Sequence, residues 1–191
     1  MPRTALACVG VFARTNQRAL EWARARSAQL VTEVNAATRE AIREIIGLAF
    51  EEGLPPREAA RLLRDVIGLH SRDAAAVADY RADLLARGAS TEFAEAKAAR
   101  YSRKLLNART ETIARTESMA AANAGQEELW QQAVERGELP EDIYEVWITT
   151  PDDALCPECA AMEGALTKVG EPFVDAGGFP PLHPHCRCVT G

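Results

Sequence analysis

Two closely spaced groups of cysteine and histidine near the C-terminal end constrain the fold of this chain more than any other feature. The first is the C-x-x-C motif Cys156–Cys159, and the second is the run His183–Cys188, so that four of the five cysteines fall in the last 36 residues. The segment between the groups is too poor in apolar residues to fold around a core of its own. Thiolates and imidazoles at such spacing can converge on one Zn²⁺, which would supply the missing stabilisation.

Six side chains in these groups are candidates for the four ligand positions of a structural zinc site. The C-x-x-C pair is the most specific part. His183 and Cys186 stand three residues apart, which suits chelation from a turn, and Cys188 competes for the fourth position. His185 lies between them and is expected to point away. We therefore predict a structural Zn²⁺ bound by four members of the set Cys156, Cys159, His183, Cys186 and Cys188.

Other chemistries of the same residues stay open at this point. The cysteines could be free thiols in a small reduced core, could form disulfides, or could hold a catalytic metal. However, the sequence has no H-x-E ahead of its C-x-x-C, as zinc deaminases require, and no H-E-x-x-H. Nucleophilic cysteine chemistry needs an orienting histidine, and the one distant histidine, His70, stands in an alanine-rich helical region where a surface or packing role is usual. We expect no enzymatic activity.

Composition indicates a largely helical protein. Hydrophobic residues make up 47% of the 191 residues, but alanine inflates that figure and aromatic residues contribute only 6%. Such a chain favours long, closely packed helices over a thick β core. No apolar run approaches the ~20 residues of a membrane span, and the short stretch 5–13 is not a signal peptide by its pattern. A cytoplasmic protein is the default expectation.

Charge is unevenly distributed along the chain. Residues 1–118 carry 19 Lys and Arg against 15 Asp and Glu, whereas residues 119–191 carry 3 against 13. The acidic C-terminal part should repel nucleic acid, so any phosphate contact belongs to the helical part. There the basic residues are interspersed with acidic ones, which is typical of a solvated helix surface.

The spacing of apolar residues predicts a succession of helices in the first part of the chain. Gly53 and the prolines that follow it mark the end of the first, and Ser71 can cap the third. The last is long for a globular protein, so we expect a kink or break near Asn107 or around Asn123–Gly125. The predicted helices span residues 15–52, 57–67, 71–87 and about 91–136.

The pattern changes after residue 137. Residues Tyr144–Thr149 alternate and are rich in β-formers, which predicts a strand, and the remainder consists of short segments punctuated by glycine and proline. The predicted fold class is mainly α. A helical N-terminal body, residues 1–137, contains the long helix, and a small irregular α+β zinc-binding module, residues 138–191, follows it.

Three stretches of the chain occur in an order that one known family shares. They are Arg109–Glu117 followed by Asn123 and Trp130; Trp147–Thr149 leading through Asp152 and Asp153 into Cys156–Gly164; and Phe173 followed by Pro180–Cys188. In this order the chain resembles the phage head morphogenesis family, the minor capsid proteins similar to protein F of phage Mu. The resemblance covers about residues 55–191, and the ending P-P-x-H-P-x-C-R-C is its most specific element.

The resemblance implies a virion component present in few copies, located at the portal vertex or in the capsid interior and in the host cytoplasm during assembly. It implies the portal protein and other capsid components as partners, a role in procapsid assembly, and no enzymatic activity of the core domain. Keeping or delivering DNA is a weaker implication. The alternative is a zinc-knuckle nucleic-acid-binding protein, against which the acidic tail and the missing interleaving of basic and aromatic residues both argue.

The segment Ile113–Glu117 offers a way to join the two predicted parts. We hypothesise that it docks the zinc-bearing tail onto the helical body, with Arg115 and Glu117 as the residues to test. The alternative is that Ile113 packs while the two charged side chains make local ion pairs or hydrogen bonds.

Overall fold

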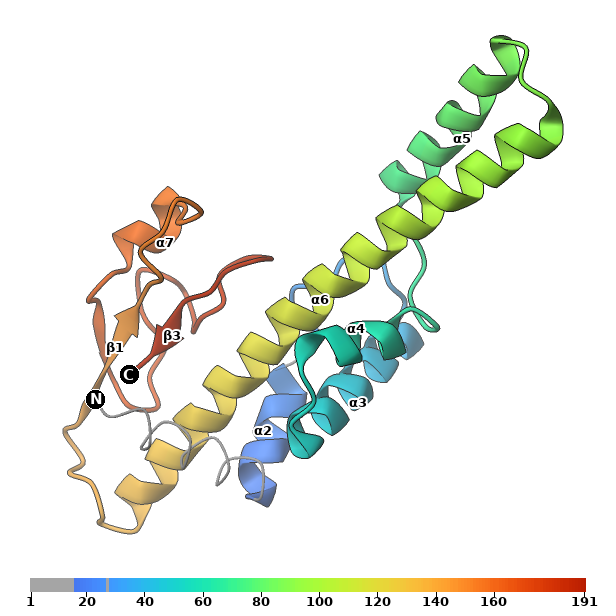
Figure 1. The fold of residues 1–191 in the computed structure, drawn as a ribbon. Helices are drawn as coiled ribbons and strands as arrows, with labels where there is room; N and C mark the ends of the chain where they lie inside the picture. Colours follow the sequence, from blue (N-terminus) through green and yellow to red (C-terminus); the bar gives the residue numbers. More distant parts are fainter. Residues whose placement is uncertain (1–15, 27) are drawn as a thin grey trace.

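The protein is built along one helix of 45 residues, α6 (Thr91–Glu135). The structure is a computed structural model that describes residues 16–26 and 28–191, so the stretch 5–13 and Thr15 lie outside the described residues. Figure 1 shows three helices beside the middle and C-terminal end of α6, and a fourth beside its N-terminal part. These helices are α2 (Gln17–Arg26), α3 (Ala36–Glu52), α4 (Pro56–Leu63) and α5 (Ser71–Ala86).

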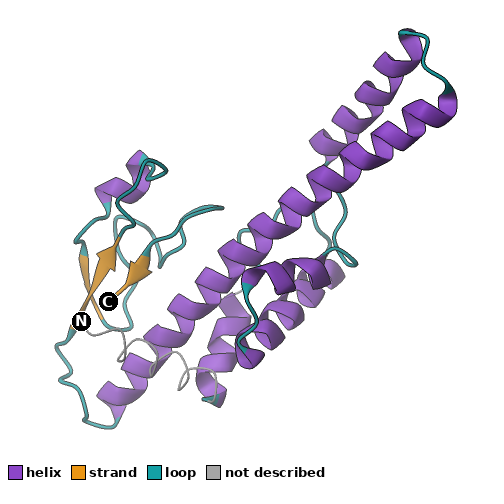
Figure 2. Cartoon of the chain, in the orientation of Figure 1, coloured by secondary structure: helices purple, strands orange, loops and turns teal. Residues whose placement is uncertain are grey.

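A small antiparallel sheet and a short helix follow α6 and lie on the side of α6 away from α3 and α4 (Figure 1). Strand β1 (Tyr144–Ile148) is central, with β2 (Leu166–Lys168) on one edge and β3 (Val189–Thr190) on the other. Helix α7 (Pro157–Ala161) stands between β1 and β2 in the chain. Loops connect these short elements (Figure 2). The prediction of a mainly helical fold with a long helix and a small C-terminal sheet is confirmed.

The expected kink or break in the long helix is wrong, since α6 is one uninterrupted helix. It begins at the N-cap Ser90, whose side chain accepts a hydrogen bond from the N–H of Phe93 at 3.3 Å. Asn107 does not compete for the helix backbone, because its side chain accepts a hydrogen bond from Arg64 at 3.2 Å. Asn123, Ala124 and Gly125 are all buried. Tertiary packing therefore stabilises the helix where local propensity is weakest.

The single helix expected over 15–52 is also wrong, because a non-helical segment, residues 28–35, separates α2 from α3. Ala28 and Glu33 in this segment have positive φ angles of 63° and 54°. Asn35 then caps α3, its side chain accepting a hydrogen bond from the N–H of Thr38 at 2.8 Å. The hydrophobic spacing continues through the segment and so gives no sign of the break.

The helical core lies where α3 and α4 pack against α6. Its largest fully buried side chains are Ile42 and Ile46 of α3 and Leu63 of α4, and Ile113 of α6 packs with them. Gly53 ends α3 with a φ of 69°, as predicted. In the described part of the chain, no helix combines the length and the apolar character that crossing a membrane would need.

Candidate metal centre

The C-x-x-C motif forms the first turn of α7. Cys156 is the N-cap of this helix, and its sulfur accepts a hydrogen bond from the N–H of Cys159 at 3.3 Å, in the place where serine or aspartate usually stands. Pro157 occupies the first helical position, where its missing N–H costs nothing. The turn therefore directs both sulfur atoms toward the same side.

The second turn is formed by residues 183–186. The N–H of Cys186 donates to the carbonyl oxygen of His183 at 3.1 Å, which closes the turn. His185 within it has a φ of 67°. Its Nε2 atom lies 3.1 Å from the hydroxyl of Thr112 on α6, so the ring faces that helix; that His185 is not a ligand stays a prediction.

The donor atoms of the two turns lie close enough to share one ion. The Nε2 atom of His183 is 3.2 Å from the sulfur of Cys156 and 3.2 Å from that of Cys159, and the sulfurs of Cys159 and Cys186 are 3.6 Å apart. Ligand atoms around a tetrahedral zinc are about 3.3–3.8 Å apart, given zinc–ligand bonds of about 2.0–2.3 Å. The donor atoms of Cys159, Cys186 and Cys188 also lie within 4.8 Å of one another.

The space between these side chains is small. The cavity that they line has a volume of about 20 Å³, and roughly 10–15 Å³ suffices for one water-sized particle. The thiolate and imidazole donors are those that zinc prefers. The cluster therefore fits a single metal ion, and the four cysteines are all free of disulfides. The choice of four ligands among the five predicted residues stays a prediction.

The surroundings of the four thiols divide them into two kinds. The backbone N–H of Cys159 donates to the sulfur of Cys156 and lowers the pKa of that thiol. Burial raises the pKa of Cys186, but hydrogen bonds with the backbone of Cys188 and Leu182 oppose it and leave the pKa lowered. Burial raises the pKa of both Cys159 and Cys188. A metal ion would have to displace protons from this second pair.

The ring of His183 is oriented by the backbone. Its Nδ1 atom lies 2.8 Å from the carbonyl oxygen of Pro184. A carbonyl can only accept, so Nδ1 carries the proton and Nε2 presents its lone pair to the sulfurs. The same contact raises the pKa of His183. Backbone partners of this kind commonly hold metal-binding histidines in place.

The core around the cluster is too small to explain the fold by itself. Its buried members are Trp147, Met162, Phe173 and three of the four cysteines, and the ring of Phe173 meets Trp147 edge to face with centroids 5.1 Å apart. Half of the buried residues of this core are candidate metal ligands, so the same side chains would form the core and bind the metal. Metal binding and folding of this region should therefore be coupled.

Three polar side chains of α6 connect this region to the helical part. The hydroxyl of Thr116 accepts a hydrogen bond from the N–H of His185 at 3.1 Å. The amide nitrogen of Asn123 donates to the carbonyl oxygens of Pro180 and Cys188, at 3.1 and 3.2 Å. The third is Thr112, which faces the His185 ring. Sequence reasoning missed these roles, although all three residues stand in or beside the stretch that carries the family resemblance.

The docking hypothesis is therefore right about the segment and wrong about the residues. Arg115 is exposed. Glu117 is buried and accepts a hydrogen bond at 2.5 Å from the N–H of Ala28, in the segment between α2 and α3. Burial raises the pKa of Glu117 to about 7. Glu117 therefore holds the N-terminal segment, and Thr116 beside it holds the C-terminal one, because adjacent residues point to different faces of a helix.

Arg109 lies about two turns before Glu117 on α6 and also binds the backbone of loops. Its guanidinium donates to the carbonyl oxygen of Gly68 at 2.7 Å and to that of Thr32 at 2.8 Å. The side chain is buried. Arg109 therefore satisfies backbone carbonyls in two loops that no regular structure pairs, and its role is structural.

Comparison with known proteins gives one match. A family model described as "Phage Mu protein F like protein" matches residues 40–191, which is well over half of the chain. Searches of curated proteins and of solved structures give no match. The matched range contains both turns of the metal cluster and the whole of α6.

Proposed function

The chain belongs to the Phage Mu protein F like family and is a phage head protein, and on this basis we propose that it is a minor head protein acting in head morphogenesis. In this proposal it binds the portal vertex and other capsid components from the capsid interior, and assists the packaging or ejection of DNA. A structural Zn²⁺ holds its C-terminal region in shape. It performs no catalysis.

The observation that carries the zinc proposal is the convergence of Cys156, Cys159, His183 and Cys186 on one small space. Four protein ligands would fill all positions of a tetrahedral zinc and leave none for a substrate or an activated water. The cavity volume of about 20 Å³ supports the same conclusion, because it has no room for a substrate. The zinc would contribute stability and shape to the surface that the region presents.

Metal content per chain tests the zinc proposal. Purified protein should contain one zinc per chain when its metal content is measured by elemental mass spectrometry. Replacement by Co²⁺ should give the visible absorption of a tetrahedral thiolate site. A protein that contains less than a tenth of an equivalent of metal, even after refolding with zinc, would overturn it.

The head role is tested in particles. The protein should be found in purified heads in a few copies, and heads assembled without it should be defective or empty. Purified portal oligomer should bind the chain in sedimentation, whereas the isolated major capsid subunit should not. Normal, filled and infectious particles assembled in its absence would contradict the proposal, whatever the metal content.

A further inference from the structure

Helices α5 and α6 form a hairpin that projects beyond the other helices (Figure 1), and residues of both helices line a groove in it. The groove encloses about 610 Å³ and is far along the chain from the metal cluster. We call it the Lys–Tyr groove. Its lining consists of three cations, two tyrosines and one alanine: Lys97, Arg100, Lys104, Tyr80, Tyr101 and Ala76.

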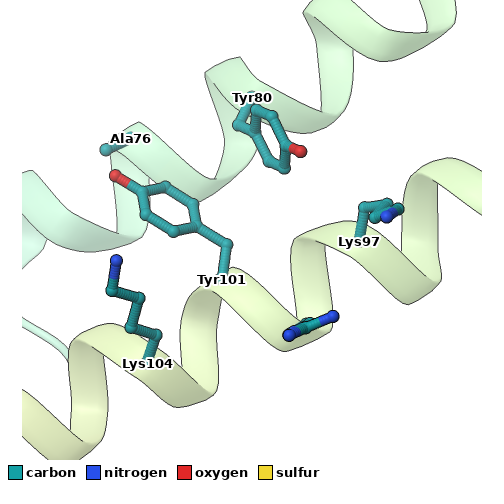
Figure 3. Close-up of a pocket in the computed structure, with 6 residues that line it drawn as sticks. Ala76, Tyr80, Lys97, Tyr101 and Lys104 are labelled. Atoms are coloured by element: carbon teal, nitrogen blue, oxygen red, sulfur yellow. The ribbon is translucent and has the colours of Figure 1, made fainter.

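The two tyrosines come from different helices. Tyr80 of α5 and Tyr101 of α6 meet edge to face, with ring centroids 5.4 Å apart and an angle of 69° between the rings. Figure 3 shows Tyr101 and Lys104 both directed from α6 toward α5, beside the small side chain of Ala76. Lys97 lies on the same helix, beyond Tyr101. Basic and aromatic side chains thus line the groove together.

Two acidic residues of the hairpin are paired with arginines that do not line this groove. Glu95 is 3.1 Å from Arg81, and Asp83 is 2.9 Å from Arg87, so each of these carboxylates already has its own arginine. No carboxylate lines the groove. Among residues 16–26 and 28–191, no ion pair includes any of the three cations of the Lys–Tyr groove.

Packing does not explain the three cations either. They are exposed, and α5 contributes no buried residue to the hairpin. Lys97 has one local contact, its ammonium lying 5.1 Å from the centre of the Phe93 ring. The spacing of Lys97, Arg100 and Lys104 places them on one face of α6, where like charges three and four residues apart repel each other and destabilise a helix. A bound anion would remove that repulsion.

A second cationic groove is lined by residues that follow those of the first along α6. It lies between α4 and α6, and we call it the arginine groove. Glu111 is the only carboxylate in its lining. From Lys97 to Glu111 the two grooves together extend over about 21 Å of α6, at 1.5 Å per residue. The arginine groove is lined by Arg57, Ala60, Arg61, Arg64, Asn107, Thr110 and Glu111.

We propose that the Lys–Tyr groove binds the phosphodiester backbone of DNA, and that the arginine groove extends the same track. Lysine, arginine and tyrosine side chains are the usual donors to backbone phosphates, and such contacts position a protein without reading sequence. The length of the track favours a linear polyanion over a single phosphate ion. The choice of DNA as the source of the phosphates rests on the proposed function, because packaged DNA fills a phage head.

Binding of a labelled 30-base-pair duplex by the full chain tests the inference, with fluorescence anisotropy followed at several salt concentrations. The triple variant K97Q/R100Q/K104Q should bind at least tenfold more weakly at 50 mM salt. The slope of log K against log salt concentration should be less negative than that of the wild type by about 2–3, because three phosphate contacts are lost. The matched control R43Q/R136Q/K168Q removes the same charge at three sites outside both grooves and should bind within threefold of the wild type.

Two further arms identify the source of the anion. Inorganic phosphate should displace the duplex no better than sulfate at equal ionic strength, because one phosphate cannot fill the track. Poly-glutamate of matched charge should bind at least tenfold more weakly than DNA. Displacement by low millimolar phosphate would make the groove a small-anion pocket and overturn the proposal. Binding of poly-glutamate more tightly than DNA would also overturn the proposal, and would indicate an acidic protein partner instead.

Equal losses in the triple variant and its matched control would also overturn the proposal, as would an absence of duplex binding at 50 mM salt. Circular dichroism should be unchanged in both variants, because all six side chains lie outside the core. Failure here leaves the proposed head role untouched, since incorporation into heads is measured separately. Conversely, the protein could bind DNA through the groove and yet be missing from heads. That result would contradict the proposed function and support the DNA-binding proposal.

Discussion

The side-chain amide of Asn123, in the C-terminal half of α6, donates a hydrogen bond at 3.2 Å to the carbonyl oxygen of Cys188, the last cysteine of the candidate metal centre. The same nitrogen donates to Pro180. One buried side chain on the long helix therefore satisfies two carbonyls of the C-terminal region, and through them helps to fix the second turn of the cluster.

Replacing Asn123 by alanine should loosen that region from α6. The change leaves two buried carbonyls without a partner, which costs about 1–3 kcal/mol. Hydrogen exchange should become faster in residues 180–190, while exchange in α3 and α4 stays as in the wild type. The matched control is Asn107→Ala, on the exposed part of the same helix, where a surface change costs about 0.5 kcal/mol or less. Equal protection of residues 180–190 in both variants would contradict this prediction.

Removing the metal should unfold the C-terminal region and spare the helices. A strong chelator should abolish most of the near-UV signal of Trp147, which is fully buried against Phe173 and the cysteines, with little loss of helicity in the far-UV. The variant Trp147→Phe identifies that signal. An unchanged near-UV spectrum in a sample proven free of metal would contradict the prediction.

The same stabilisation should weaken in acid. Metal binding requires the cysteines to lose protons and His183 to be neutral, so the affinity for zinc falls as pH falls. The midpoint of chelator-induced unfolding should therefore move to lower chelator concentration as pH decreases from 8 to 6. A midpoint independent of pH would indicate that thiolates are not the ligands.

The two histidines of the second turn should behave differently. His183→Ala removes a donor that lies 3.2 Å from two sulfurs, and should lower zinc affinity at least tenfold. His185→Ala removes a ring that faces Thr112 and should leave zinc content at one per chain. The serine variant of Cys159, which belongs to both groups of donors, should lose the metal altogether, whereas Cys188→Ser should reveal whether that cysteine binds.

Glu117 should make the helical part less stable as pH rises. Its pKa in the folded protein is about 7, above the ordinary value of 4.5, because burial disfavours the charged form. A raised carboxyl pKa contributes stability that is full below pH 4.5 and is lost as pH rises through 7. At 1.36 kcal/mol per pKa unit the loss is on the order of 3 kcal/mol.

Glu117→Gln can keep the hydrogen bond from Ala28 and carries no charge, so it should remove that loss and be more stable than the wild type above pH 7. Urea unfolding at a series of pH values measures this difference. Glu111→Gln, which removes an exposed carboxyl from the same helix, should keep the slope of the wild type. A pH dependence that is the same in wild type and Glu117→Gln would show that burial of this carboxyl costs nothing.

The sequence was sufficient to predict those helix ends and strands that depend on residues close to them in the chain. Gly53 and the alternation around Trp147 predicted the end of α3 and the strand β1. The convergence of the cysteine and histidine side chains was also predictable, because C-x-x-C and H-x-x-C spacing each fit one turn. The family resemblance, drawn from the order of three motifs, is confirmed by the family model.

The errors share one physical cause, which is contact between residues distant in sequence. The break before α3 depends on Glu117 and Arg109, whose side chains bind the backbone of residues 28 and 32. The continuity of α6 depends on neighbours that bury Asn123. The basic and aromatic lining of the Lys–Tyr groove was likewise not predictable from the sequence, because Tyr80 and Tyr101 face each other only after α5 folds back on α6. The division into parts at residue 137 stays a prediction.

The absence of any interruption in α6 has a geometrical consequence. Lys97 in the Lys–Tyr groove and Asn123 beneath the metal cluster belong to one helix, which at 1.5 Å per residue sets them about 39 Å apart. The continuous helix therefore sets a nearly fixed separation between the Lys–Tyr groove and the side chain that binds the C-terminal region.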